Sequence, residues 1–378
     1  MKFEKLKNIV EVKKGKKPSF VDTPDENSVR VLQIDDLRND TNPKFTNDKT
    51  GVFAKEDDVL IAWDGANAGT IGYGKSGYIG STIALLRKKQ PDLYSTTFIG
   101  IFLQSQYQYL RSKTTGATIP HISRKALDEL EVPVISVNDQ LHIANLLSKA
   151  ENLIVQRKES ISLLDEFLKS TFLEMFGNTR HYSKSDVVKT IGEICNTRGG
   201  GTPSKAKPEY YTGEIPWVSP KDMKWLYITT SQDKITPQAI DESSTALIPK
   251  GSLLMVIRSG ILKSKLPLAI NKVDVTINQD MKAFTSKEVT TEYLLYFFFS
   301  EERSILKKVK GTTADNLNFD DVKKMKIKIP PLELQTQFAQ IVEKTEALKT
   351  QYQQSLQELE NLYGSLSQKA FRGELTKY

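Results

Sequence analysis

The chain has little cysteine, little histidine and no long apolar run, and each shortage excludes a class of protein. Its one cysteine, Cys195, can form neither an internal disulfide nor a cysteine-based zinc site. The three histidines, His121, His142 and His181, lack the spacing of metal ligands or of a catalytic triad. We therefore expect no metal and no catalytic residue. The longest apolar stretch, residues 293–299, is too short to span a bilayer.

The remaining bulk properties are those of a globular protein with a polyanionic partner. Residues 1–5 lack the apolar segment of a secretory signal, so we expect a cytoplasmic protein without a membrane span. The 378 residues are enough for two or three domains. Lys and Arg number 53 against 46 Asp and Glu, and the net charge of +7 has the sign expected for a protein that binds a phosphate backbone.

The chain repeats itself in two registers. Residues 116–176 align without a gap with residues 311–371, and Gly15 aligns with Gly200 near the starts of the two copies. Between these matched ends the similarity is poor, and the second copy is longer. Similar ends around a divergent middle favour one scaffold that presents two different surfaces.

Each copy ends in a predicted long helix. Residues 141–176 contain neither Pro nor Gly, and residues 337–371 repeat their pattern with Gly364 as one weak point. Apolar positions alternate at three and four residues, which is typical of a coiled-coil seam. In the first helix these positions are Ile143, Leu147, Ala150, Ile154, Ile161, Leu164, Leu168 and Met175. A helix of this length reaches roughly 54 Å, and antiparallel packing of the two helices is the economical way to bury both seams.

The segments before the helices are predicted as mixed α/β domains. Apolar runs at residues 59–63 and 252–257 are typical of buried strands, and each leads into a polar turn. The sequence therefore predicts two mixed α/β domains separated and joined by two long antiparallel coiled-coil helices, in a pseudo-two-fold repeat. The expected bounds are 1–136 for the first domain, 137–178 for the first helix, 179–331 for the second domain and 332–378 for the second helix.

Residues 69–76 read Gly-Thr-Ile-Gly-Tyr-Gly-Lys-Ser and match the phosphate-loop pattern. A phosphate loop needs a helix directly after its Lys-Ser pair, because the helix N-terminus binds the phosphate. Residues 77–81 contain two glycines and no helical periodicity, so we interpret the segment as a Gly-rich hairpin or surface loop. A phosphate-loop NTPase that uses Lys75 and Ser76 is the enzymatic alternative. Residues 42–45, Asn-Pro-Lys-Phe, match an amino-methyltransferase loop only in part and are interpreted as a turn.

Basic, aromatic and amide side chains gather in loops at equivalent places in the two copies. Residues 13–19 correspond to residues 198–205, where small residues would let backbone N–H groups approach phosphate and cations would supply counter-charge. Loops after the two predicted strands carry Asn and Arg, which read adenine and guanine edges in the major groove. The predicted DNA-contacting residues are Lys13, Lys14, Lys16, Lys17, Ser19, Trp63, Asn67, Lys75, Arg198, Thr202, Ser204, Lys205, Lys207, Tyr211, Trp217, Lys221, Arg258, Ser259 and Lys263.

Over essentially its whole length the chain resembles the specificity subunit of type I restriction–modification systems. The resemblance rests on the order domain, helix, domain, helix, on residues 200–204 (Gly-Gly-Thr-Pro-Ser) and on residues 370–375 (Ala-Phe-Arg-Gly-Glu-Leu). The helix starts at residues 137–140 and 330–335 are also similar. The first copy departs from the pattern at residues 15–19, which read Gly-Lys-Lys-Pro-Ser.

The resemblance implies that each domain is a target-recognition domain for one half of a bipartite site in double-stranded DNA. The helices would fix the gap between the half-sites and dock methyltransferase (modification) subunits, two per specificity subunit. Separate restriction subunits would translocate and cut, and this chain would need no cofactor. Half-sites on one face of a duplex lie about 34 Å apart or a multiple of it, which helices of roughly 54 Å can span. The recognition subunit of a related restriction system that cuts both sides of its site, and a coiled-coil scaffold without DNA contact, stay open as alternatives.

Overall fold

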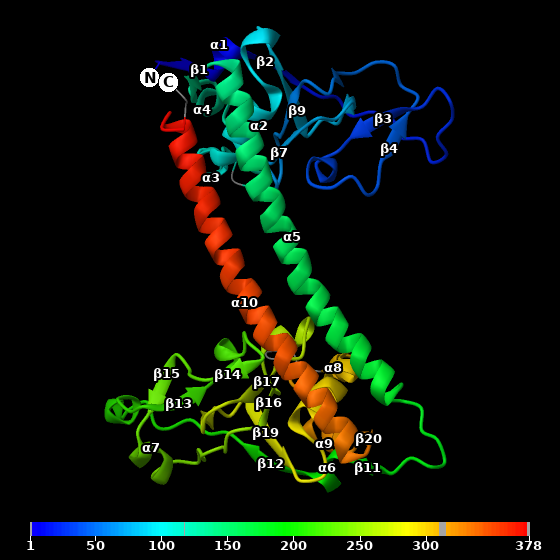
Figure 1. Cartoon of the computed structure of the whole chain (residues 1–378), viewed down its shortest axis with the longest axis vertical. Coiled ribbons are helices and arrows are strands. Elements are labelled where there is room, and N and C mark those ends of the chain that lie inside the picture. The colour runs from blue at the N-terminus through cyan, green and yellow to red at the C-terminus, as the bar shows by residue number, and fades with distance from the viewer. Residues whose placement is uncertain (1, 117, 310–314, 376–378) are drawn as a thin grey trace. The chain divides into compact units, whose positions relative to one another are not determined.

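The computed structural model describes residues 2–116, 118–309 and 315–375, and these form two compact units. Unit 1 comprises the described residues of Met1–Glu159 and Gln354–Tyr378, and unit 2 comprises those of Ser160–Gln353. Two helices of 40 residues each, α5 (Val137–Phe176) and α10 (Leu332–Phe371), contribute one half to each unit. Figure 1 shows both helices as long continuous ribbons.

Both long helices begin upstream of the periodic segments 141–176 and 337–371 and end with them, at Phe176 and Phe371. Ser136 extends α5 upstream, because its Oγ accepts a hydrogen bond from the backbone N–H of Asp139 at 3.1 Å and so caps the first turn. The other helix, α10, begins at Leu332, directly after Pro331. A proline disfavours helical backbone in the residue before it, so the helix begins once Pro331 has been passed. Gly364 does not interrupt α10.

The predicted seam is buried within each unit by antiparallel packing of the helix halves. In unit 1, Ile143 and Leu147 share a core cluster with Ala370, and Lys158 forms an ion pair with Glu360 at 2.8 Å. Later residues of α5 therefore contact earlier residues of α10, which means that the two helix halves run antiparallel. Unit 2 follows the same rule, with Asp165 paired to Lys349 and the ring of Phe172 5.4 Å from that of Phe338.

The β structure of unit 1 consists of two four-stranded sheets and one two-stranded ribbon. Its strands are β1 (Lys2–Lys5), β2 (Val10–Lys14), β3 (Val29–Leu32), β4 (Lys44–Thr46), β5 (Phe53–Ala54), β6 (Val59–Ala62), β7 (Ile71–Tyr73), β8 (Gly77–Ile79), β9 (Ile83–Lys88) and β10 (Glu131–Val134). The sheet orders are β2-β9-β6-β7 and β4-β3-β8-β5, and β1 pairs antiparallel with β10. The β3–β8 pair runs parallel. The short helices are α1 (Leu6–Ile9), α2 (Thr96–Ser105), α3 (Tyr107–Ser112), α4 (Arg124–Asp128), η1 (Asp35–Leu37) and η2 (Pro91–Leu93).

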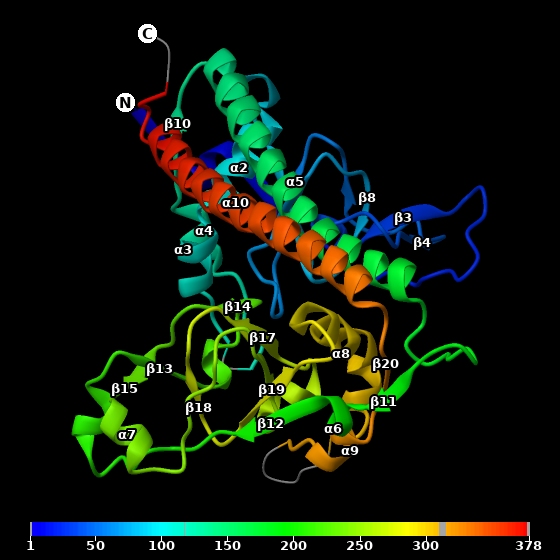
Figure 2. The ribbon, with the colours of Figure 1, turned by 60° about the horizontal axis from the view of Figure 1, so that its bottom comes forward.

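Unit 2 has the same kind of architecture, and Figure 2 shows its strands with α8 beside them. Its strands are β11 (Val188–Thr190), β12 (Cys195–Gly199), β13 (Ile215–Val218), β14 (Tyr227–Ile228), β15 (Asp233–Ile235), β16 (Leu253–Val256), β17 (Leu268–Asn271), β18 (Thr276–Ile277), β19 (Met281–Ser286) and β20 (Lys326–Lys328). The sheet orders are β12-β19-β16-β17-β14, β15-β13-β18 and β11-β20, and β13–β18 runs parallel. The short helices are α6 (Ile191–Ile194), α7 (Pro237–Asp241), α8 (Thr291–Leu306), α9 (Phe319–Lys323), η3 (Pro208–Tyr211), η4 (Pro220–Asp222) and η5 (Gly260–Lys263).

Corresponding elements occur in the same order in the two units, which confirms the predicted duplication and the mixed α/β fold. The pair α1 and β2 corresponds to α6 and β12 in the register of Gly15 and Gly200, and α4 and α5 correspond to α9 and α10 in the second register. The parallel pair β3–β8 recurs as β13–β18. Both predicted buried strands are present, as β6 and β16. Five of the positions aligned from the sequence, Ala117 and Gly311 to Ala314, lie outside the described residues.

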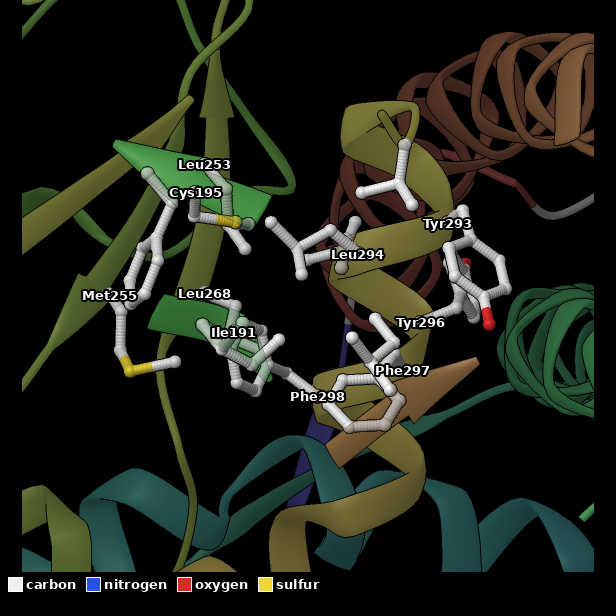
Figure 3. Close-up of a cluster of buried hydrophobic side chains, with 14 of the residues drawn as sticks. Ile191, Cys195, Leu253, Met255, Leu268, Tyr293, Leu294, Tyr296, Phe297 and Phe298 are labelled. Atoms are coloured by element: carbon white, nitrogen blue, oxygen red, sulfur yellow. The ribbon is translucent and has the colours of Figure 1, made fainter. Parts of the chain in front are cut away.

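The apolar run at residues 293–299 lies in α8, at the centre of the unit 2 core. Figure 3 shows Leu294 and Phe298 of α8 on the side of Leu253 and Cys195, and Tyr293 and Tyr296 on another side of the helix. Burial raises the pKa of the Cys195 thiol to about 12, so this cysteine is a packing residue. Within the described part of the chain, no helix is both long and apolar enough to cross a membrane.

Candidate nucleic-acid interface

Four loops of unit 1 meet at the ends of β2, β6 and β8. The backbone N–H of Trp63 donates to the carbonyl of Thr82 at 2.7 Å, and the N–H of Ile122 donates to the carbonyl of Trp63 at 2.9 Å. The N–H of Gly65 donates to Pro120 at 2.9 Å. We call residues 13–15, 63–65, 80–83 and 120–122 the unit 1 junction. Its backbone is fixed by these hydrogen bonds, so its side chains project from a defined frame.

The equivalent loops of unit 2 meet through the same hydrogen bonds. The N–H of Ile257 donates to the carbonyl of Asp280 at 2.8 Å, and the N–H of Leu317 donates to the carbonyl of Ile257 at 2.8 Å. Ser259 donates to Asp315 at 3.0 Å, as Gly65 donates to Pro120. We call residues 198–201, 257–259, 278–281 and 315–317 the unit 2 junction. One backbone frame therefore occurs twice.

Gly15 and Gly200 hold the first loop of each junction against the end of the parallel strand. A Cβ on Gly15 would lie 2.3 Å from the carbonyl oxygen of Gly80, and a Cβ on Gly200 would lie 1.9 Å from that of Asn278. Their backbone N–H groups donate internally, to Ile83 at 2.9 Å and to Met281 at 3.4 Å. The expectation that small residues here free backbone N–H groups for phosphate is wrong for these two glycines. They are small because the chain passes close to carbonyl oxygens.

The side chains of the unit 1 junction form a charged group around Asp64. Its carboxylate lies 2.7 Å from Nζ of Lys14 and 2.6 Å from Nδ1 of His121. Burial by itself would raise the pKa of Asp64, but the hydrogen bonds from Lys14 and His121 outweigh it and hold the pKa below its usual range. From the sequence, His121 was one of three scattered histidines. Only the tertiary pairing of Asp64 with His121 brings it to the junction.

The unit 2 junction carries different side chains on the same frame. Arg258 takes the place of Asp64, and Asn316 takes the place of His121 in the same isolated bridge. The Arg258 guanidinium lies 4.0 Å from the Asp280 carboxylate, which also accepts a hydrogen bond from Asn278 at 3.2 Å. Arg198, near the end of β12, is exposed. Both junctions present exposed donors near a carboxylate.

The remaining unit 1 residues predicted to contact DNA divide into exposed and supporting side chains. Lys16 and Lys17 are exposed and form no ion pair within the described residues. Lys13 is exposed and pairs with Glu11 at 3.1 Å. Ser19 is also exposed, and its backbone N–H donates to the Asp48 carboxylate at 2.8 Å. Supporting interactions hold Asn67, whose Oδ1 accepts from Arg38 at 2.6 Å, and Trp63, which packs on the unit 1 core.

In unit 2, the other exposed residues that the sequence predicts to contact DNA are Ser204, Lys205 and three lysines. Each of these three lysines pairs with an acidic side chain. These are Lys207 with Glu242 at 2.7 Å, Lys221 with Asp233 at 2.7 Å and Lys263 with Asp315 at 3.8 Å. The pairs of Lys207 and Lys221 are solvent-exposed, so a phosphate can compete for these lysines, whereas Asp315 beside the exposed Lys263 is largely shielded.

Other predicted residues of unit 2 support the loops from inside. Trp217 is buried, and its Nε1–H donates to the carbonyl of Gly201 at 3.0 Å. The hydroxyl of Tyr211 donates to Pro203 at 2.7 Å, and its ring packs on Trp217. Thr202 donates to the side chain of Gln279, and the Ser259 hydroxyl caps η5. These side chains position the loop after β12 and the start of η5.

A polar cleft opens beside the unit 1 junction and was not predicted from the sequence. Its lining includes amide and basic side chains that flank η1, precede or begin β4, or lie in the β6–β7 loop, and two carboxylates of η1. The amide and basic residues are Gln33, Arg38, Asn39, Asn42, Lys44 and Asn67, and the carboxylates are Asp35 and Asp36. Amide and guanidinium groups are the types that pair with base edges. The turn interpreted from residues 42–45 leads into β4 at Lys44.

The segment that matches a phosphate loop joins two strands. Lys75 and Ser76 lie between β7 and β8, so a strand follows them where a nucleotide-binding loop has a helix. The Lys75 side chain is largely buried and pairs with Asp40 at 3.3 Å. Burial and the neighbouring Arg30 lower the pKa of Lys75. This arrangement does not support a phosphate-loop NTPase.

Comparisons with known proteins agree on one family. The family model described as "Type I restriction modification DNA specificity domain" matches residues 1–163 and 184–361. The specificity subunit of the EcoR124I/EcoR124II type I restriction enzyme of Escherichia coli is 42% identical over 164 residues, which are 42% of this chain and 41% of that relative. The chain thus matches less than half the length of that relative. The MjaVIII specificity subunit of Methanocaldococcus jannaschii is 27% identical over 354 residues, which are 86% of this chain and 81% of that relative.

Solved structures show the same fold over nearly the whole chain. The S subunit of a type I restriction-modification system from M. genitalium has a TM-score of 0.60 at 17% identity, covering 98% of this chain and 96% of that one. A chain from a structure on complex assembly and conformational transition of the type I R-M system has a TM-score of 0.57 at 16% identity, covering 98% and 97%. The chain therefore belongs to the type I restriction–modification DNA specificity family.

Proposed function

We propose that the two domains, residues 1–136 and 179–331, each read one half of a bipartite site in double-stranded DNA. One observation carries this proposal: the two junctions share a hydrogen-bonded backbone frame but carry different side chains. A repeated frame places two readers in the same way, and different side chains give them different base preferences. The segments 137–178 and 332–378, which contain α5 and α10, set the gap between the half-sites. The chain itself performs no catalysis.

Exposed cations near each junction supply sequence-independent affinity. Lys16 and Lys17 lie just after β2, and in unit 2 Arg198 lies near the end of β12 and Lys205 lies in the loop that follows it. Contacts from such side chains to phosphate oxygens position a protein on the duplex but do not read the sequence. Because each contact releases counterions, the affinity of the complex for DNA falls steeply as salt rises.

The solvent side of α5 is the proposed dock for modification subunits. It carries large apolar side chains that are exposed and lie opposite the buried seam at helical spacing, namely Leu141, Leu153, Val155, Leu163, Phe167 and Leu173. In the repeat register, Leu153 and Phe167 correspond to Leu348 and Leu362 of α10, which are also exposed. An apolar surface that occurs once per repeat fits two modification subunits. Restriction subunits then join the DNA-bound assembly.

A domain exchange tests the division into two readers. Residues 1–136 are replaced by the corresponding domain of a relative, and methylated adenines are mapped by sequencing the genome of a host that expresses the complex. We expect one half of the methylated site to change and the other half and the gap to stay the same. A change in both halves, or in neither, would overturn the proposal.

A second experiment tests the dock. Phe167→Asp and Leu163→Asp replace exposed apolar side chains by charges, so co-purification of the modification subunit with the chain should be lost. Phe167→Leu keeps an apolar side chain at the same position and should co-purify as the wild type does. Retention of the modification subunit by both aspartate variants would exclude this face of α5.

A further inference from the structure

The junctions align residue by residue, because their backbone hydrogen bonds are the same. Trp63 and Ile257 occupy one position of the frame, donating to Thr82 and Asp280 respectively. The residue after each of them is therefore also equivalent. That residue is Asp64 in unit 1 and Arg258 in unit 2, and each makes an isolated bridge, with His121 and Asn316. The same position of the repeated frame thus carries a negative side chain in unit 1 and a positive side chain in unit 2.

In both junctions a shielded carboxylate lies beside more exposed hydrogen-bond donors, within 2.7 Å of Lys14 and His121 in unit 1 and 4.0 Å from Arg258 in unit 2. Asp64 has 16% of its side chain exposed, whereas its partners Lys14 and His121 have 51% and 46% exposed. Asp280 has 24% of its side chain exposed, and its partner Arg258 has 53% exposed. The exposed donors therefore face solvent, and the carboxylates of Asp64 and Asp280 lie behind them. A cation held only by other exposed groups would keep its rotamer freedom, whereas these cations are partly ordered before a ligand arrives.

The chemistry of the exposed donors matches the acceptor edge of guanine in the major groove. O6 and N7 of guanine are two adjacent acceptors, and a guanidinium binds both at once. A lysine ammonium also donates to this edge. A ligand that offered only phosphate oxygens would need no carboxylate beside the cation, because that carboxylate repels the phosphate.

We propose that Arg258 in unit 2 and the Lys14–His121 pair in unit 1 are the base-reading groups of their junctions and that each contacts the major-groove acceptor edge of a guanine. Asp280 and Asp64 are positioning residues that hold them. This inference rests on the proposed function of the two domains. It adds which side chains carry the specificity and which base they read. Lys16, Lys17 and Lys205 remain phosphate contacts without base preference.

Arg258→Lys tests the reading role because it keeps the charge but loses the two-pronged geometry. The variant is expressed as the full chain with its modification subunits, and methylated adenines are mapped across the host genome. We expect one guanine position in one half-site to lose its preference by about 5- to 150-fold. The other half-site and the gap stay unchanged. Lys205→Ala is the matched control and should weaken DNA binding at every sequence without altering the recognised site.

Asp64 is tested as a positioning residue by a pair of variants. Asp64→Asn removes the charge that holds Lys14 and His121, so one position of the other half-site should relax, with the melting temperature of the chain unchanged. Asp64→Glu keeps the carboxylate and should recover part of the preference. Arg258→Lys and Asp64→Asn are expected to act on opposite half-sites. A structural effect on the whole chain would not produce this pattern.

The outcomes separate this inference from the proposed function. If Arg258→Lys and Asp64→Asn leave every base preference intact while the wild-type complex still methylates a bipartite site, the inference is wrong and the proposed function stands. If the wild-type complex shows no bipartite site, the proposed function itself fails. Relaxation of the same half-site by both variants would also overturn the assignment of one reading group to each unit.

Discussion

Gln140 and Gln335 make equivalent hydrogen bonds in the two units. The Oε1 of Gln140 accepts from the backbone N–H of Ser95 at 2.9 Å, and the Oε1 of Gln335 accepts from that of Thr290 at 2.8 Å. Ser95 caps α2 and Thr290 caps α8. Both glutamines are fully buried on the first turn of a long helix. Each one therefore joins the start of its long helix to the start of the domain's buried helix.

Gln140→Leu should destabilise unit 1 by about 2–4 kcal/mol, because the N–H of Ser95 and the carbonyls of Leu93 and Ile135 lose their buried partner. Gln335→Leu should act in the same direction on unit 2. Urea unfolding followed by circular dichroism measures the change. Gln357→Leu, at an exposed position of α10, is the control and should stay within about 0.5 kcal/mol of wild type. Equal stability of all three variants would contradict the anchoring role.

Gly15→Ala and Gly200→Ala should each destabilise the chain by about 1–3 kcal/mol, since the new Cβ would overlap a carbonyl oxygen of the neighbouring strand end. The backbone must move to relieve that overlap, so the junction frame moves too and DNA binding weakens. Gly260→Ala is the control, because its Cβ would meet nothing within 4 Å. Thermal melting and DNA titration of the assembled complex provide both measurements. Wild-type melting of Gly200→Ala would show that this close approach is absent in solution.

The sequence predicted the parts of the fold that depend on local pattern. The seam from Ile143 to Met175, the two buried strands and the doubling follow from periodicity and self-similarity, which a single segment carries within itself. Pairs such as Gln140 with Gln335 and Gly15 with Gly200 also aligned. The structure gives the physical reason why the same residue type occurs in both copies. In each case the reason is a contact with residues that are distant in the sequence.

The sequence could not predict which candidate side chains face outward. Trp217 has the aromatic character of a DNA-stacking residue, yet it is buried and supports Gly201. His121 had no motif around it, and the strand pairing that places it beside Asp64 is non-local. Residue type indicates what a side chain can bind, whereas packing decides whether it is free to do so. The cleft beside the unit 1 junction went unpredicted for the same reason.

Glu151→Gln should raise the melting temperature near neutral pH. Glu151 is half-buried between the helix halves of unit 1, and burial raises its pKa above the ordinary value of 4.5. The folded state therefore binds this proton more tightly than the unfolded state, and stability falls as pH rises from 4.5 through the raised pKa. Above the raised pKa this loss of stability is complete. Glutamine carries no charge at that position, so the variant avoids the loss. The gain should shrink as pH falls toward about 4, where both states hold the proton.

Melting curves at several pH values, with Glu159→Gln as the exposed control on the same helix, check this dependence. A gain that is the same at low and neutral pH would mean that the amide acts by packing and not by removing a buried charge. The same carboxylate contributes, after burial, to the raised pKa of Tyr363, which is about 12. The Tyr363 titration should therefore move toward its ordinary range in Glu151→Gln.

Gly364→Ala should stabilise the chain by about 0.5–1 kcal/mol, because glycine inside a helix loses more backbone entropy on folding than alanine does. The added Cβ would meet nothing within 4 Å, and Gly364 lies inside the continuous helix α10. Gly74→Ala is the matched control: its Cβ also meets open space, but its φ of +69° is unfavourable for alanine, so that variant should lose stability. The urea midpoint should shift upward for Gly364→Ala with an unchanged slope. A downward shift would contradict this account, because it would show that alanine is less favourable than glycine at this position of α10.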